Sequence, residues 1–87
     1  MTYTIKIENM QFDPSTLTIK MGDKVVWINE DEMTHTATRK DQPAFDTGPL
    51  KKNDKSEEIA FNEKSDSSGF DYHCSPHPFM VAKIIVR

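Results

Sequence analysis

A short segment near the C-terminus places three potential metal ligands at regular spacing. Cys74, His77 and Met80 stand three residues apart and supply a thiol, an imidazole and a thioether. One thiolate, two imidazoles and a long axial methionine form the ligand set of blue-copper sites. The segment contributes only one of the two imidazoles, so another part of the chain must supply the second.

The second imidazole belongs to His35 or to His73, one of which lies next to Cys74. Residues 70–74 alternate apolar and polar side chains like a strand, so neighbouring side chains point to opposite faces. If Cys74 faces the interior, His73 therefore faces solvent. His35 stands at the head of an extended segment after a loop and is free to reach the same end. We predict that the metal ligands are His35, Cys74, His77 and Met80.

Two prolines restrict the backbone on either side of His77. Pro76 and Pro78 lower the entropy lost when the imidazole is held in place. We expect the ring edge of His77 to reach the surface inside an apolar patch of Pro76, Pro78 and Phe79. A small apolar patch beside a metal site suits a weak, transient encounter, so this patch is our predicted docking site for a partner protein.

The rest of the chain reads as short strands that must position this segment. Apolar residues recur with period two, which is typical of half-buried strands. Expected strands or extended segments cover residues 3–8, 16–21, 25–28, 34–39, 57–61, 70–74 and 82–86. Residues 40–54 read as a loop with room for a short turn of helix. We predict an all-β, Greek-key β-sandwich of seven to eight strands, with Tyr72 placed as in the tyrosine corner of such folds.

Length, charge and cysteine usage exclude several classes of protein. With 87 residues the chain forms one domain, residues 1–87, with a modest core and no cleft between lobes. A net charge of −3 argues against binding to a nucleic-acid backbone. No apolar run is long enough for membrane insertion. A single cysteine rules out an intramolecular disulfide and zinc sites that need two or more cysteines.

The full pattern resembles the cupredoxins, the small blue-copper proteins. The matching residues are Trp27–Asn29, Met33–His35, Asp71–Met80 and Lys83–Val86. Plastocyanin-type members have a longer spacing between the second histidine and the methionine, so this chain is similar to the short-loop members. The resemblance implies a two-sheet sandwich that holds one copper ion, Cu(I)/Cu(II), and transfers single electrons between larger redox proteins.

The resemblance also implies where the protein works and with what. Cupredoxins of this kind act outside the cytoplasm, in the periplasm, between a dehydrogenase donor and a c-type cytochrome acceptor. The N-terminus shows no basic region followed by an apolar stretch, so we expect no signal peptide in this chain. That fits a cytosolic protein or a mature exported form, and the resemblance favours the latter. We expect a monomer.

Two residues depart from the family pattern. Thr36 stands where the family usually has an asparagine whose side chain ties the two ligand-bearing loops together. A threonine hydroxyl offers the same kind of contact with a shorter reach. Ala82 stands where similar sequences favour glycine. Neither residue belongs to the ligand set, but outer hydrogen bonds tune such sites.

Other functions fit the residues less well. A copper chaperone or storage protein using the same ligands is the alternative, although Met10, Met21 and Met33 are scattered rather than clustered. A cysteine hydrolase needs an exposed thiolate beside a base, whereas Cys74 is expected to point inward. We therefore expect no catalytic residues and no enzyme activity. The acidic run of residues 30–32 reads as a solvated loop.

Overall fold

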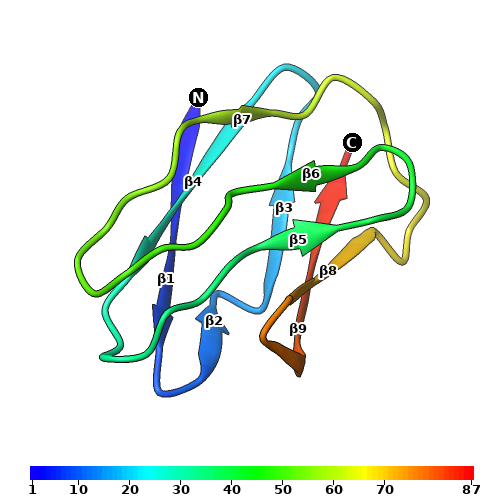
Figure 1. The fold of residues 1–87 in the computed structure, drawn as a ribbon. Helices are drawn as coiled ribbons and strands as arrows, with labels where there is room; N and C mark the ends of the chain where they lie inside the picture. The colour runs from blue at the N-terminus through cyan, green and yellow to red at the C-terminus, as the bar shows by residue number, and fades with distance from the viewer.

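Two β-sheets packed face to face make up the computed structural model, which describes residues 1–87 (Figure 1). The first sheet has four strands, in the spatial order β2 (Gln11–Asp13), β1 (Thr2–Glu8), β4 (Lys24–Asn29) and β7 (Ile59–Ala60). The second sheet has five, in the order β3 (Thr16–Ile19), β9 (His77–Val86), β8 (Phe70–Cys74), β5 (Thr38–Arg39) and β6 (Phe45–Asp46).

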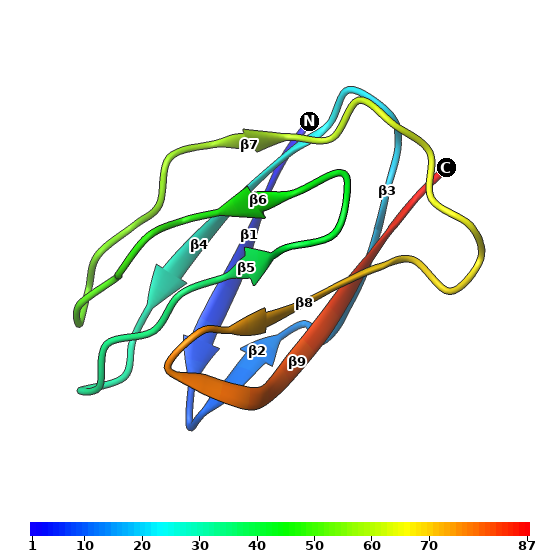
Figure 2. The same cartoon turned by 45° about the vertical axis from the view of Figure 1, so that its right-hand side comes forward.

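Each sheet combines parallel and antiparallel neighbours. β1 runs parallel to β4, with Tyr3 opposite Val25, and β3 runs parallel to β9, with Leu17 opposite Ile84. β1–β2 and β8–β9 are antiparallel hairpins. Their two turns lie at the same end of the sandwich, the lower end in Figures 1 and 2. The predicted β-sandwich is thereby confirmed.

The structure has nine strands, so the predicted count of seven to eight is too low. The short strands β2 and β6 were not expected, because two or three residues carry too little alternation to be recognised. Residues 40–54 contain β6 and an isolated bridge between His35 and Leu50, but no turn of helix. The molecule contains no helix long and apolar enough to cross a membrane.

Several predicted strand bounds also change. The expected strand over 57–61 shrinks to Ile59–Ala60, that over 16–21 ends at Ile19, and within 34–39 only Thr38–Arg39 pairs as a strand. The largest difference is the last strand, which begins at His77 rather than at Ala82. Residues 79–82 are all apolar, so the sequence shows no apolar–polar alternation in the first half of β9, although exposed and buried side chains alternate there in the structure.

An aromatic cluster fills the space between the sheets. Trp27 is fully buried, stacks on Phe45 at 5.5 Å between ring centroids and meets the ring of Tyr72 edge-on at 5.5 Å. The indole Nε1–H of Trp27 donates a hydrogen bond to the Tyr72 hydroxyl at 3.2 Å. This bond crosses between the sheets, whereas a tyrosine corner would bind backbone upstream. Burial raises the pKa of the Tyr72 phenol, so it stays neutral.

Candidate metal centre

The β8–β9 hairpin is irregular at the point where it carries the predicted ligands. His73 pairs with Val81, but the next pair is Cys74 with His77, so Pro78, Phe79 and Met80 have no partners in the ladder. Pro78 has no N–H to donate to a ladder, which favours such a break. The bulge brings His77 directly opposite Cys74 across a two-residue turn. Bulges of this kind re-aim side chains beside functional sites.

Three donor atoms converge at this end of the sandwich. The Sγ of Cys74 lies 3.5 Å from Nδ1 of His35 and 3.4 Å from Nδ1 of His77. The ligand atoms of the three residues all lie within 4.8 Å of one another, a separation that a single metal ion can bridge. Cys74 and His35 are fully buried, while His77 is half-buried and reaches the surface.

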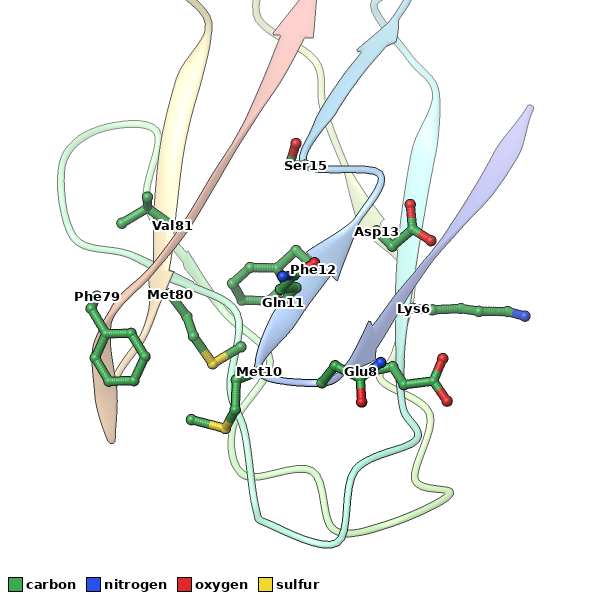
Figure 3. Close-up of a pocket in the computed structure, with 11 residues that line it drawn as sticks. Lys6, Glu8, Met10, Gln11, Phe12, Asp13, Ser15, Phe79, Met80 and Val81 are labelled. Atoms are coloured by element: carbon green, nitrogen blue, oxygen red, sulfur yellow. The ribbon is translucent and has the colours of Figure 1, made fainter.

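Met80, the fourth predicted ligand, lies three residues beyond His77 in β9 and is 3 % exposed. Its side chain points toward the β1–β2 turn and borders the same groove as Met10 (Figure 3). This placement is compatible with a weak axial thioether, and the role of Met80 as a ligand remains a prediction.

His73 faces away from the site. The burial pattern of β8 alternates, with Phe70, Tyr72 and Cys74 buried and His73 only half-buried. His73 pairs with Thr38 of β5 on one side and with Val81 on the other. As the strand-parity argument expected, Cys74 faces the interior and His73 does not, and the choice of His35 as the second imidazole ligand stays a prediction.

Thr36 does connect the two ligand-bearing segments despite its short side chain. Its Oγ1 accepts a hydrogen bond from the backbone N–H of Ser75 at 2.9 Å, and its own backbone N–H donates to Cys74 Sγ at 3.4 Å. The same hydroxyl contacts Thr38 Oγ1 at 2.9 Å, which in turn donates to Asp46. An N–H donated to the sulfur stabilises the thiolate, the form that binds metal.

Sequence reasoning missed Asp31. Within a run of three acidic residues it was expected to be solvated, but its Oδ2 lies 2.8 Å from Nε2 of the buried His35. Burial raises the pKa of Asp31, and hydrogen bonds from the N–H groups of Met10 and Asn9 and from His35 outweigh it and lower the pKa overall. The spacing of four residues before His35 was the only signal, and it is weak in a loop.

Asn29 is a second residue whose role sequence reasoning did not find. Its buried amide donates to the carbonyls of Met33 at 2.8 Å and Leu50 at 2.7 Å, and its Oδ1 accepts the N–H of Asp31 at 2.9 Å. The bonds to Met33 and Asp31 hold the loop between β4 and His35 against the first sheet, and the bond to Leu50 holds the segment whose backbone pairs with His35. They position the loop so that His35 enters the site from that side.

The donor set suits copper. A thiolate and two imidazole nitrogens are soft to intermediate ligands, and the converging cluster contains no carboxylate of the kind that calcium or magnesium prefers. A two-sheet sandwich that buries such a set at one end defines the cupredoxin class. A family model of copper-binding proteins, the plastocyanin/azurin family, matches residues 1–87, and the chain belongs to that family. Its cofactor is one copper ion.

Among curated proteins the chain is similar to amicyanins. It is 35% identical over 87 residues to amicyanin of Paracoccus denitrificans and 37% identical over 87 residues to that of Paracoccus versutus. These alignments cover 95% of this chain but 63% of each relative, so the chain spans less than two thirds of their length. Amicyanin-alpha of Methylorubrum extorquens is 32% identical over 86 residues, covering 95% of this chain and 70% of that protein.

Solved structures lead to the same family. A proline-to-glycine mutant of amicyanin in its oxidized state superposes with a TM-score of 0.88 at 30% identity, covering 99% of this chain and 82% of that chain. A reduced tryptophan-to-tyrosine mutant of amicyanin gives a TM-score of 0.86 at 31% identity, covering 97% and 80%. The resemblance drawn from the sequence is thereby confirmed.

Proposed function

We propose that the protein is a type 1 blue-copper electron carrier that shuttles single electrons between larger redox proteins. Its copper would be held by His35, Cys74, His77 and Met80. The observation that carries the proposal is the approach of Cys74 Sγ to within 3.5 Å of His35 Nδ1 and 3.4 Å of His77 Nδ1 at one end of the sandwich. Copper supplies the one-electron couple between Cu(I) and Cu(II).

The chain's own residues provide a rigid and mostly dry frame for that couple. Cys74 is the dominant donor, and full burial of Cys74 and His35 keeps water from competing for the metal. His35 is fixed by Asp31, and the Cys74 turn by Thr36. A frame that moves little on oxidation or reduction favours fast transfer. His77 is the only half-buried member of the cluster, so we assign it as the electron port.

Copper reconstitution tests this function directly. Copper-free protein given one equivalent of Cu(II) is expected to show an intense blue thiolate-to-copper band and a narrow copper hyperfine splitting by EPR. Ascorbate should bleach the band and an oxidant should restore it. A pale product bound only through nitrogen and oxygen would contradict the proposal. A blue product that gives up copper readily and has no reversible potential would favour storage or delivery of copper instead.

The surface around His77 fits a small docking site. Pro76 and Pro78 are exposed, Phe79 is 71% exposed, and the rings of His77 and Phe79 lie 6.0 Å apart between centroids. We infer that redox partners, among them a dehydrogenase donor and a c-type cytochrome acceptor, dock here. In keeping with the resemblance, we place this exchange outside the cytoplasm, in the periplasm, and we assign the protein no enzyme activity of its own.

Electron self-exchange tests the docking patch without a known partner. In Phe79→Glu, two copies meeting through this patch bring like charges together, so the self-exchange rate at low ionic strength is expected to fall about tenfold or more. The rate is measured by NMR line broadening in mixtures of the Cu(I) and Cu(II) forms. Thr18→Glu is the control. Thr18 lies in β3 opposite Ile85, so this variant adds the same charge near the end of β9 that is far from His77. Equal rates in both variants would remove the patch from the mechanism.

A further inference from the structure

One carboxylate joins the metal centre to a turn in the other sheet. Asp31 Oδ1 accepts the backbone N–H of Asn9 at 2.7 Å, and its Oδ2 accepts the N–H of Met10 at 3.0 Å. The same Oδ2 lies 2.8 Å from Nε2 of His35. The Asp31 side chain is 15% exposed, so water replaces little of this network. A chain of short contacts therefore runs from His35 to the β1–β2 hairpin.

The turn that these contacts reach, between β1 and β2, has an unfavourable backbone conformation. Asn9 and Met10 are the two residues between β1 and β2, and both have positive φ, 56° and 59°. Asparagine tolerates this region, but the left-handed conformation is unfavourable for a residue with a longer side chain such as Met10. Two successive N–H groups in such a turn form a concave site for an anion. The Asp31 carboxylate occupies that site and holds the turn.

The contact between His35 and Asp31 depends on which nitrogen of His35 carries a proton. His35 is fully buried, with Nδ1 facing Cys74 Sγ and Nε2 facing Asp31. A neutral imidazole has one donor and one acceptor nitrogen, and either can hold the proton. A metal ion on Nδ1 leaves the proton on Nε2, where it can only donate to Asp31. Metal binding thus selects the tautomer that attracts the carboxylate.

We propose that Asp31 is a positioning residue that couples copper occupancy at His35 to the conformation of the Asn9–Met10 turn. The proposal rests on the function proposed above. With copper bound, the Nε2–H group of His35 holds Asp31, and Asp31 holds both N–H groups of the turn. Without copper, both tautomers of His35 are accessible, and the one with an unprotonated Nε2 has no proton to donate to Asp31, which weakens the hold of Asp31 on the turn.

The turn matters because of what it places beside the metal centre. Met10 lines a groove of about 460 Å³ together with Phe79, Met80 and Val81 (Figure 3). Phe79 belongs to the proposed docking patch, and Met80 is the predicted axial ligand. A copper-dependent turn would therefore give the loaded and the empty protein different surfaces at the edge of that patch.

Amide hydrogen exchange in the wild-type protein is the first test. We expect Cu(I) to slow exchange of the Asn9 and Met10 amides about tenfold relative to the copper-free protein, the effect of a strengthened charge-assisted hydrogen bond. The control is the Ser68 amide, which Asp66 Oδ1 holds in the same way at 3.0 Å in another turn. It should not respond. Exchange at Asn9 and Met10 that is as insensitive to copper as that at Ser68 would overturn the proposal.

Substitution of Asp31 tests the coupling itself. In Asp31→Asn the amide group must face either the turn or His35, both of which present N–H donors. We expect the copper dependence of exchange at Asn9 and Met10 to disappear and the Cu(II) dissociation constant to rise about 10–100-fold, the usual cost of losing an outer partner. Glu30→Gln removes the same charge one residue earlier and should leave both quantities near wild type. Equal effects of the two variants would mean that the loss of a negative charge, and not the position of Asp31, causes the change, and would overturn the proposal.

The outcomes separate this inference from the proposed function. A wild-type protein that gives no blue band with Cu(II) overturns both. A blue protein whose Asn9 and Met10 amides ignore copper overturns only the coupling. If Asp31→Asn does not fold, the wild-type exchange comparison still decides the question, because it needs no substitution.

Discussion

Replacement of Cys74 by serine is expected to abolish the intense visible band of the Cu(II)-loaded protein. The band arises from a thiolate bound to copper, and a serine hydroxyl is a hard, weak ligand that cannot replace it. The fold should survive, because serine is close to cysteine in volume and can still accept the Thr36 N–H that now reaches Sγ at 3.4 Å. Visible absorption and EPR of the reconstituted variant measure the effect, with circular dichroism to confirm folding.

The neighbouring histidine supplies the matched control for this experiment. His73→Ala changes the adjacent residue in the same strand, whose side chain points away from the site. Its blue band should match that of the wild type. A blue band retained in Cys74→Ser, or lost in His73→Ala while the fold persists, would mean that the ligands are not the ones proposed here.

Replacement of Asn29 by alanine is expected to have the largest effect on stability among the polar residues around the site. The side chain is fully buried and makes three hydrogen bonds, two to carbonyls and one from the Asp31 N–H. Each buried group left without a partner costs about 1–3 kcal/mol, so with partial rehydration we expect a loss of about 2–4 kcal/mol in the free energy of unfolding. That is a large share of the roughly 5–15 kcal/mol typical of a domain.

Chemical denaturation of the copper-free protein measures this loss. Asn62→Ala is the control, since Asn62 is an exposed loop residue. Because the affected loop carries His35, copper should bind more weakly to Asn29→Ala and stabilise it less than it stabilises the wild type. A loss below about 1 kcal/mol would show that other contacts hold the loop, since that is the scale of one ordinary hydrogen bond.

Local patterns were sufficient to predict the strands with a clear alternation or a continuous apolar run. β1 and β8 alternate over seven and five residues, and β4 contains a run of four apolar residues, so their sequences show them directly. The inward orientation of Cys74 followed from the same alternation. The first half of β9 could not be found this way, because residues 79–82 are apolar on both faces of the strand and Pro78 is typical of a turn.

Contacts distant in sequence account for the parts of the site that the sequence concealed. Asp31 is chemically indistinguishable from its acidic neighbours, and only the approach of the Asn9–Met10 turn from another strand pair makes it a buried anchor. Asn29 is the last residue of β4, a position where an asparagine would suit solvent equally well, so its sequence context does not indicate burial. The ligand spacing, by contrast, is local in β8 and β9, which is why three of the four proposed ligands were readable from one short segment.

The position of the last strand determines when the metal centre can form. β9 lies between β3 and β8, so β3 stays separated from the rest of the second sheet until this ten-residue strand is in place. Its parallel pairing with β3 joins residues more than sixty positions apart, which makes this step slow relative to hairpin formation. A partly synthesised chain ending before residue 77 has no binding pocket. Copper can therefore be bound by the proposed ligands only after β9 has been synthesised and the sandwich has closed.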